Sequence, residues 1–364
     1  MKNLLVTLLS DQTIPNVHFI KYIQGILKTE GKEFEHLFIS TEGMERKGVG
    51  QWIRKVCAIA DLQTIVVEHN SLSDIQEKLQ NTGDYETYFV NVTGGTKIMS
   101  IGVSSFFKEK ANARIYYIDG NKCWLNFPES ERHSGNLVDN INLTEYVGSY
   151  GFEMREGSLS GIDFEYTKRF LPEFLKLGDA EWRIINQLRE KRRKGTAVRE
   201  INGLQDLLCK IGFPVSDEKF LTVNKDEVKY LTGDWFEEYI YFRLKEEKAI
   251  SDGNLKTGVH LVKNNIDNEF DVVFLHNTKF YAVECKTSIL SDKGNIINET
   301  IYKSTALQKN LGLFSNFSIF TLSSKDGNEV KQTHINRAKD LNIKFFCRED
   351  IVNCTNISKL LGLC

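Results

Sequence analysis

The sequence predicts an α/β protein with two sheets and a helical segment between them. Three observations support this fold class. Over the first 120 residues, short apolar runs alternate with amphipathic helical segments, which is typical of a Rossmann-like, doubly wound parallel sheet. A charged, helix-rich segment follows, and the chain then returns to an order of helix, strands, helix, strand, helix and strand. The 364 residues are too many for one compact core. We therefore expect an N-terminal domain at 1–148, a helical connector at 149–225 and a second α/β domain at 226–364.

The elements of the N-terminal domain follow from hydrophobic periodicity. Apolar runs predict strands, and apolar residues that recur every three or four positions predict helices. The strands are expected at 3–10, 33–40, 63–69, 88–92 and 113–120. The helices are expected at 17–29, 51–60, 73–80 and 97–110. The short segments CWLNF and GNLVDN are expected to form an edge hairpin. In such a sheet, ligands bind at the carboxyl ends of the strands.

The C-terminal domain is expected to open with a helix over 233–247. Its strands are predicted at 258–263, 269–276, 279–287, 317–323 and 343–347, with helices at 298–314 and 329–341. The connector ends a predicted helix with the basic run REKRRK (Arg189–Lys194). Cations near a helix C-terminus are usually solvated and favourable there, so this interpretation is preferred over a phosphate-binding role.

Composition excludes several classes of protein. The formal net charge is -2, so a protein that coats DNA non-specifically is not expected, and any nucleic-acid contact must rely on local patches. The 7 cysteines are scattered without a CxxC pair, which argues against a disulfide framework or a zinc site and indicates a reducing, cytoplasmic setting. No apolar stretch approaches the roughly 20 residues that span a bilayer, so no membrane partner is expected.

The segment NEFDVVFLHNTKFYAVECKTS (268–288) places charged residues inside two apolar strands. Glu284 and Lys286 are two positions apart, so they point to the same face of a strand. Asp271 is expected beside Glu284 when the turn lies near HNTK. Adjacent carboxylates repel each other unless a cation joins them. The pattern predicts a Mg²⁺ or Mn²⁺ site formed by Asp271, Glu284 and the backbone carbonyl of Cys285.

Two further residues complete this hypothesis. Lys286 is expected to orient or help deprotonate an attacking water and to offset the charge of the reacting phosphate. Glu237, on the preceding helix, is expected to bind a metal-linked water, and its neighbour Glu238 competes for that role. The alternative is that all these charges belong to the rim of an exposed hairpin.

The segments GDWFE, EFDVV and AVECKTS together resemble the PD-(D/E)xK nucleases, over roughly residues 230–325. The resemblance implies a restriction-endonuclease-like fold and a metal-dependent endonuclease. It assigns the catalytic positions to Glu237, Asp271, Glu284 and Lys286. It also implies that Lys303 or Gln308 on the next helix contacts a substrate phosphate. The chain departs from the literal motif at Phe270, which replaces the proline.

The segment NVTGGTKIMS (91–100) follows a predicted strand and opens a helix. Its glycines allow close approach of the backbone to a ligand, and a helix N-terminus favours anions. It matches neither the dinucleotide nor the P-loop fingerprint, and an ordinary strand-to-helix turn is the alternative. Polar loops after the first and second strands converge on the same edge. The predicted ligand-binding residues are Ser10, Gln12, Thr13, Thr41, Asn91, Thr93, Gly94, Gly95, Thr96 and Lys97.

Through NVTGGTK and the loop after the first strand, residues 1–145 resemble the CARF domains of CRISPR-associated effectors. Followed by a PD-(D/E)xK-like domain, the whole chain is similar to the Card/Can type of nuclease in type III CRISPR defence. The resemblance implies a homodimer that binds a cyclic oligoadenylate, expected to be cyclic tetra-adenylate, and then cuts DNA or RNA with Mn²⁺ or Mg²⁺. A catalytically inactive sensor or DNA-binding regulator and a constitutive repair or restriction endonuclease are the alternatives.

Overall fold

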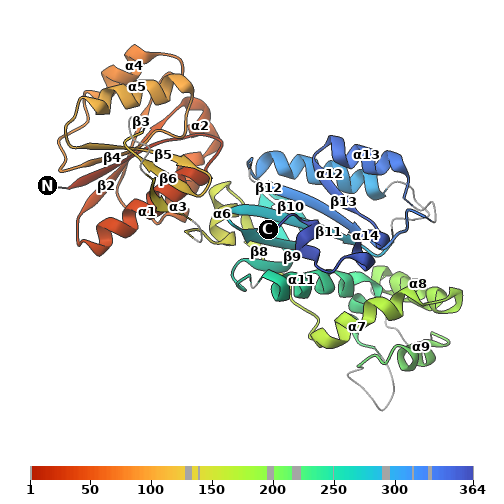
Figure 1. Cartoon of the computed structure of the whole chain (residues 1–364). Coiled ribbons are helices and arrows are strands. Elements are labelled where there is room, and N and C mark those ends of the chain that lie inside the picture. Colours follow the sequence, from red (N-terminus) through yellow and green to blue (C-terminus); the bar gives the residue numbers. More distant parts are fainter. Residues whose placement is uncertain are drawn as a thin grey trace.

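A computed structural model describes residues 2–127, 133–137, 140–194, 201–214, 223–248, 250–288, 296–313, 315–326 and 330–363. Positions 138, 139, 314 and 329 of the predicted elements lie outside these residues, as does Cys364. The chain forms two lobes, each built on its own sheet (Figure 1). The two-sheet α/β fold class is therefore confirmed.

The first sheet is a doubly wound sheet with strand order β3-β2-β1-β4-β5-β6-β7. Its first five strands pair in parallel and its last two are antiparallel. The strand order reverses between β1 and β4, where ligands bind in folds of this kind. The strands are β1 (Asn3–Leu8), β2 (Phe34–Ser40), β3 (Leu62–Val66), β4 (Tyr88–Asn91), β5 (Ala113–Asp119), β6 (Lys122–Leu125) and β7 (His133–Asn136).

Helices cover both faces of the first sheet. Apolar residues of α4 and α5, such as Ile75 and Met99, pack against one face, and residues of α1, α3 and α6, such as Val17 and Tyr146, pack against the other. The helices are α1 (Ile14–Thr29), α2 (Glu42–Lys47), α3 (Val49–Val56), α4 (Leu72–Leu79), α5 (Lys97–Lys108) and α6 (Leu143–Ser149). The short helix α2 was not predicted, because it has no buried residue and hence no apolar period.

The second sheet has six strands in the order β13-β12-β11-β10-β9-β8. Helices α12 and α13 cover one face, and α11 covers the other. The strands are β8 (Glu153–Arg155), β9 (Leu255–Lys263), β10 (Ile266–His276), β11 (Lys279–Lys286), β12 (Ser315–Thr321) and β13 (Ile343–Phe346). The helices are α11 (Trp235–Lys248), α12 (Ile296–Asn310), α13 (Gln332–Asp340), α14 (Arg348–Asn353) and α15 (Ile357–Leu360).

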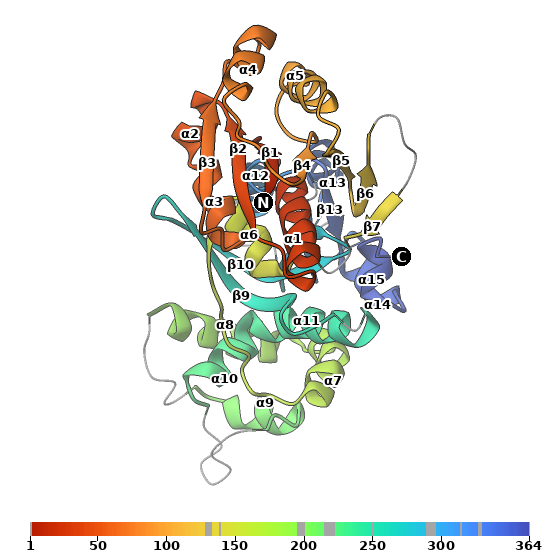
Figure 2. The same cartoon turned by 90° about the vertical axis from the view of Figure 1, so that its left-hand side faces the viewer.

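The helical segment between the sheets packs against the second lobe. Phe170 and Phe174 contact Trp235 of α11, with ring centroids 4.9 and 4.6 Å apart, in a core that continues to the second sheet. Figures 1 and 2 both place α7–α9 beneath the second sheet and away from the first. Its elements are α7 (Phe164–Leu175), α8 (Asp179–Lys194), α9 (Leu204–Lys210), α10 (Lys225–Lys229) and the π-helical turn η1 (Tyr230–Asp234). The expected domain boundaries stay predictions.

The two lobes share a packed junction. The ring of Tyr146 stacks on Phe280 of β11 at 5.6 Å, and its hydroxyl donates to the Leu311 carbonyl at 3.0 Å. One apolar cluster runs from the first sheet across this contact to the second. Gly312 is required in the junction, because a Cβ atom there would lie 2.0 Å from the Tyr150 hydroxyl. The two lobes therefore pack directly against each other close to the end of α12.

Within the described residues, no helix is both long and apolar enough to cross a membrane. The six cysteines of these residues are free thiols.

Candidate active site and glycine loop

The charged hairpin is formed by β10 and β11, which are joined by a two-residue turn. Asn277 and Thr278 both have positive φ, 48° and 63°, as a type I′ turn requires. The turn pairs His276 with Lys279 and fixes the antiparallel register up to Val272 and Val283. Just beyond this register, Asp271 and Glu284 come close enough for the Lys286 ammonium to contact both carboxylates. The turn near HNTK was therefore placed correctly from sequence.

The two carboxylates are buried and joined by a lysine. Asp271 is 8% exposed and Glu284 is 5% exposed. The Lys286 ammonium lies 3.1 Å from Asp271 Oδ2 and 3.2 Å from Glu284 Oε2. The backbone N–H of Cys285 also donates to Asp271 Oδ2, at 2.6 Å. The hairpin thus holds two buried carboxylates around one ammonium group. Burying any of these charges without a partner would cost much free energy, and the pairing offsets that cost.

Burial and neighbouring charges shift the protonation of this group. Burial raises the pKa of Asp271 to about 6, the charge of Glu284 adds to the rise, and Lys286 opposes it. Burial alone would lower the pKa of Lys286, but the charges of Asp271 and Glu284 outweigh it and raise that pKa above its usual value. In this arrangement Lys286 is therefore an ammonium that supplies charge rather than a base.

Glu237 approaches the same centre from α11. Burial raises its pKa well above the usual range, and the charges of Asp271 and Asp234 raise it further. Its neighbour Glu238 points elsewhere, since its carboxylate accepts from the Ser160 hydroxyl at 2.9 Å. Of the two glutamates considered from sequence, the structure brings Glu237 to the hairpin.

Lys303 of α12 contacts the site from a third element. Its ammonium lies 3.0 Å from Glu284 Oε1 and also donates to the Glu269 carbonyl. Gln308, the alternative on the same helix, donates to the Ser315 carbonyl at 3.2 Å. Lys303 is therefore the α12 side chain placed at the hairpin.

The donors present fit a hard divalent cation. Asp271 and Glu284 offer carboxylate oxygens side by side, and Cys285 adds a backbone carbonyl between Glu284 and Lys286. In the part of the chain that the structure describes, no three or more His, Cys, Asp or Glu side chains form a cluster suited to a metal. Two carboxylates suffice for Mg²⁺ or Mn²⁺, which retain several waters and take further oxygens from a phosphate substrate.

The glycine loop follows β4 in the first sheet. Gly94 passes so close to β1 that a Cβ atom would lie 2.2 Å from the Leu8 carbonyl oxygen, and Gly95 has a φ of 73°. Gly94 therefore requires glycine, and the positive φ of Gly95 favours it. Thr96 caps α5 by accepting from the Met99 N–H at 3.2 Å, and Lys97 begins the helix. The loop presents backbone and a helix N-terminus at the switch point of the sheet.

Asn91 and Thr93 hold this loop in shape. The Asn91 side-chain oxygen accepts from the Thr93 N–H and hydroxyl, at 3.1 and 2.7 Å. The Thr93 hydroxyl oxygen in turn accepts from the Ile118 N–H at 2.7 Å. Asn91 is buried, so it shapes the loop from behind, while Thr93 is only partly buried.

An open hollow of about 580 Å³ lies beside the loop. Its lining combines loop residues, one face of α5, and an aromatic pair whose rings stack at 4.6 Å. These residues include Thr93, Gly95, Lys97, Ser100, Tyr117 and Phe127. Sequence analysis did not select Ser100, Tyr117 or Phe127. The sequence does contain one indication of this lining: four polar residues recur every three or four positions on one face of α5, namely Lys97, Ser100, Ser104 and Lys108.

The other predicted ligand-binding residues divide into groups. The Ser10 hydroxyl lies beside the glycine loop, 3.3 Å from the place of a Gly94 Cβ. Gln12 instead accepts from the Leu313 N–H at 3.0 Å, across the junction of the lobes. Thr13 is buried and bonds Ser149 at 2.8 Å, and Thr41 caps α2 through the Met44 N–H. Ligand contact by these residues stays a prediction.

Two family models match separate parts of the chain. The model described as the Card1 CARF domain matches residues 4–146, and the model described as Card1-like, endonuclease domain matches residues 224–359. The chain joins a CARF domain to a Card1-like endonuclease domain. The glycine loop thus lies in the CARF domain and the charged hairpin in the endonuclease domain.

Solved structures support the same fold over nearly the whole length. Can2 from Sulfobacillus thermosulfidooxidans, in complex with cyclic tetra-adenylate, is 22% identical with a TM-score of 0.69, covering 94% of this chain and 95% of its own. The protein VC1899 from Vibrio cholerae is 18% identical with a TM-score of 0.74, covering 96% of this chain and 95% of its own. A comparison with curated proteins finds no match.

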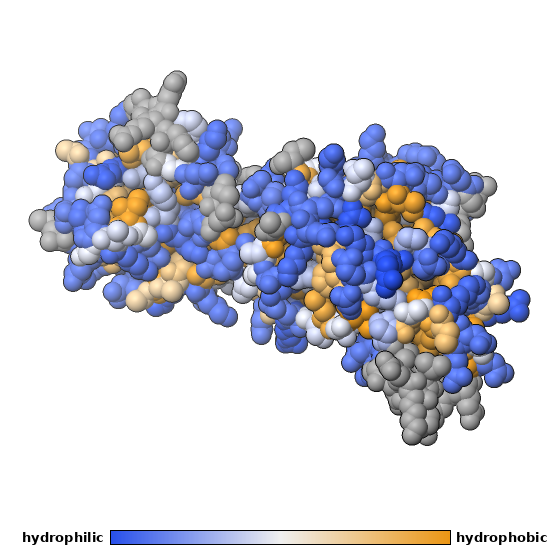
Figure 3. All heavy atoms as spheres, turned by 60° about the horizontal axis from the view of Figure 1, so that its bottom comes forward, coloured by the Kyte–Doolittle hydropathy of each residue, from blue (hydrophilic) through white to orange (hydrophobic). Residues whose placement is uncertain are grey.

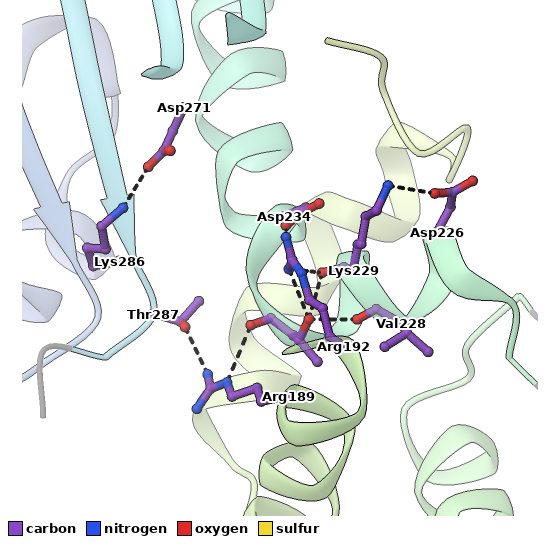
Figure 4. A network of polar contacts seen from close by, with 10 residues as sticks. Arg189, Arg192, Asp226, Val228, Lys229, Asp234, Asp271, Lys286 and Thr287 are labelled. Carbon is purple, nitrogen blue, oxygen red and sulfur yellow. Dashed lines mark hydrogen bonds and ion pairs between the residues drawn. The ribbon is translucent and has the colours of Figure 1, made fainter. Parts of the chain in front are cut away.

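The endonuclease domain receives further charged residues that sequence analysis did not assign. Arg189 of α8 bonds Thr287, the residue after Lys286, and Arg192 pairs with Asp234 at 2.7 Å (Figure 4). The helical segment therefore contributes side chains to the edge of the endonuclease site. Asp234 could have been selected from the sequence, because it lies three residues before Glu237 and residues three apart in a helix share a face.

Proposed function

We propose that the chain is a metal-dependent nuclease of type III CRISPR antiviral defence, activated by a cyclic oligoadenylate and most suited to cyclic tetra-adenylate. The observation that supports this most strongly is the buried Asp271–Lys286–Glu284 group in a domain matched by an endonuclease model. A structural neighbour of similar architecture, Can2, is described in complex with cyclic tetra-adenylate. The proposed substrate is DNA, and RNA by the same chemistry.

Cleavage of a phosphodiester needs positive charge where the reacting phosphate becomes more negative. A bound Mn²⁺ or Mg²⁺, held by Asp271, Glu284 and the Cys285 carbonyl, would supply Lewis-acid activation. Lys286 contributes a fixed ammonium on the same face of β11 as Glu284. Lys303 adds a second ammonium from α12. Glu237 faces the centre from the other side and can hydrogen-bond a water there.

The proposed activator site is the glycine loop of the CARF domain. Gly94 and Gly95 expose the backbone, Lys97 supplies one cation at the start of α5, and the neighbouring hollow has room for a nucleotide. A cyclic, symmetric oligonucleotide is best recognised by a two-fold site, in which the same loop acts from two copies. We therefore propose a homodimer through the CARF domains, acting in the cytoplasm.

The two sites communicate only through the protein. An activator at the glycine loop can control the hairpin solely by preferring one arrangement of the domains. The loop after β1 is suited to this role, because Ser10 lies beside Gly94 and Gln12 bonds Leu313, just after α12. Lys303 of α12 reaches Glu284. A shift of α12 would thus alter the charge around Glu284.

The test combines the purified chain with labelled single- and double-stranded DNA and RNA, Mn²⁺ or Mg²⁺, and each cyclic oligoadenylate in turn. We expect cleavage that requires both metal and activator. Cleavage that needs no activator would identify a constitutive nuclease instead. Activator binding with no cleavage of any substrate would identify an inactive sensor.

The homodimer is tested by light scattering with and without activator. We expect a mass near twice 41.8 kDa. A mass near 41.8 kDa under both conditions would contradict the two-fold site.

A further inference from the structure

The basic end of α8 is not simply a solvated helix terminus. The run Arg189–Lys194 contains five cations, and the sequence favoured an ordinary exposed helix end. In the structure, Arg189 and Arg192 instead turn toward the endonuclease domain (Figure 4). Lys191, Arg193 and Lys194 extend from the same turn, with Arg193 and Lys194 exposed. The interpretation of a solvated helix end does not describe Arg189, which is half-buried, whereas Arg192 is exposed but paired with Asp234.

Arg189 contacts the strand that carries the reactive lysine. Its Nη2 donates to the Thr287 hydroxyl at 2.9 Å, and Thr287 directly follows Lys286. Figure 4 shows Thr287 pointing toward Arg189 while Lys286 points toward Asp271. Nη1 donates to Asn186 Oδ1 at 3.1 Å, and Nε donates to the Thr232 carbonyl at 3.4 Å. Among the described residues, Arg189 makes no ion pair with a carboxylate.

This environment is unusual for an arginine. Burial lowers the pKa of Arg189, since its surroundings disfavour the charged form and no described carboxylate compensates for it. Its neighbour Arg192 differs, because it pairs with Asp234 at 2.7 Å and also donates to the Thr232 hydroxyl at 3.0 Å. One arginine is thus neutralised by the protein, and the other offers its charge at the edge of the site.

The Arg189 guanidinium is half-buried, lies 5.6 Å from the centroid of the Trp182 ring and has no described carboxylate partner, so it is suited to an anion that arrives with the substrate. Its planar fork matches the oxygens of a phosphate. The chain as a whole has a formal net charge of -2, so attraction of nucleic acid must come from local groups. On the side of the molecule seen from below, hydrophilic side chains cover most of the larger lobe, with apolar patches between them (Figure 3).

We propose that Arg189 binds a backbone phosphate of the nucleic-acid substrate next to the scissile one, and that the exposed cations Arg193 and Lys194 continue this phosphate track along α8. The helical segment between the two sheets is then part of the substrate-binding surface. Arg192 is a positioning residue that holds Asp234 and the start of α11. This inference rests on the proposed nuclease function and adds to it the surface that holds the strand.

The test measures binding of a labelled oligonucleotide to the full chain in EDTA, over a series of salt concentrations, together with activator-dependent cleavage. The variants are Arg189→Gln and the exposed pair Arg193→Gln/Lys194→Gln. The control is Arg183→Gln, which removes the same charge from an exposed position on the same helix. We expect Arg189→Gln to weaken binding about tenfold and to reduce the salt slope by roughly 0.7 to 0.9, as one lost phosphate contact does.

A merely structural role gives a different result. If Arg189 only stabilises the end of β11 through its bond to Thr287, Arg189→Gln lowers the unfolding temperature but keeps the salt slope of the Arg183 control. That result would overturn the proposal. If Arg189→Gln folds poorly, the double variant Arg193→Gln/Lys194→Gln still tests the proposal. An unchanged salt slope in this double variant would contradict phosphate binding along α8. Absence of cleavage and binding in the unaltered protein would instead overturn the nuclease function itself.

Discussion

The glycine loop, the proposed activator site, and the charged hairpin, the proposed active site, differ in burial and in charge. The loop in the CARF domain is open, built from backbone and neutral side chains, and carries one lysine at the start of a helix. The hairpin in the endonuclease domain is buried and concentrates Asp271, Glu284, Lys286 and Lys303 within hydrogen-bonding distance. Recognition of an intact ligand needs shape and N–H donors, whereas bond cleavage needs fixed charge in a site with little water.

The difference has a practical consequence for variants. Removing a charge from the hairpin should abolish chemistry without touching recognition, and filling space at the loop should abolish recognition without touching chemistry.

Loss of charge at the hairpin should have the largest effect. We expect Glu284→Ala or Lys286→Ala to lower the cleavage rate by at least roughly 10²-fold, because each removes stabilisation of the reacting phosphate. Binding of labelled cyclic tetra-adenylate should be unchanged. Asp267→Asn, which alters an exposed acid on β10, the other strand of the hairpin, is the control. Near-normal cleavage in both hairpin variants would place the active site elsewhere.

Removal of divalent metal should stop cleavage in the same way. Asp271 and Glu284 offer two carboxylates, which hold a hard cation only together with waters and substrate oxygens. We expect EDTA to abolish cleavage and added Mn²⁺ or Mg²⁺ to restore it, followed with a labelled oligonucleotide. Binding of the activator in EDTA serves as the control. Full cleavage in excess chelator would show that the two lysines act without a metal.

Filling the glycine loop should weaken activator binding. A Cβ atom at Gly95 would lie 3.2 Å from the Met99 side chain, and its φ of 73° disfavours other residues. We expect Gly95→Leu or Lys97→Ala to bind cyclic tetra-adenylate at least about tenfold more weakly by titration calorimetry. The activator-dependent part of cleavage should fall equally. Gly94 is unsuitable for this test, since a Cβ there would meet the Leu8 backbone at 2.2 Å and disturb the sheet.

Cutting the contact between the domains should separate the two activities. Gln12→Ala removes the acceptor of the Leu313 N–H while leaving Ser10 and the glycine loop in place. We expect activator affinity within a factor of about two of the unaltered protein and a reduced stimulation of cleavage, since couplings of this kind amount to roughly 1–3 kcal/mol. Equal stimulation in the variant would show that coupling does not pass through this contact.

Acid should destabilise the CARF domain through its buried histidine His36. Burial lowers the pKa of His36 to about 4, and its ring nitrogen Nε2 accepts from the Gln24 side-chain amide at 3.2 Å. The unfolded chain therefore binds more protons between pH 6.5 and about 4, so stability is present above pH 6.5 and is lost as the pH falls through this window. The loss is on the order of 3 kcal/mol. Calorimetry should show that the unfolding temperature depends less on pH in His36→Gln than in the unaltered protein. The exposed control His69→Gln should keep the pH dependence of the unaltered protein.

The sequence predicted most strands because apolar runs and turn residues are local signals. The hairpin turn at Asn277 and the cap at Thr96 were readable in the same way. The choice between Glu237 and Glu238 was not, since one residue turns a helix by 100° and the direction depends on how α11 packs. Gln12 and Arg189 were equally inaccessible, because their partners are 301 and 98 residues away in the chain. Long-range partners follow from packing of the lobes rather than from local pattern.

The most direct test of the account measures activator binding and cleavage on the same samples of the unaltered chain, Lys286→Ala and Gly95→Leu. Cyclic tetra-adenylate is titrated in the presence of Mn²⁺ and a labelled oligonucleotide. We predict that Lys286→Ala binds the activator normally but does not cleave, and that Gly95→Leu neither binds nor responds while remaining folded. Cleavage by Gly95→Leu that rises with activator as in the unaltered chain would contradict the claim that the glycine loop controls the hairpin.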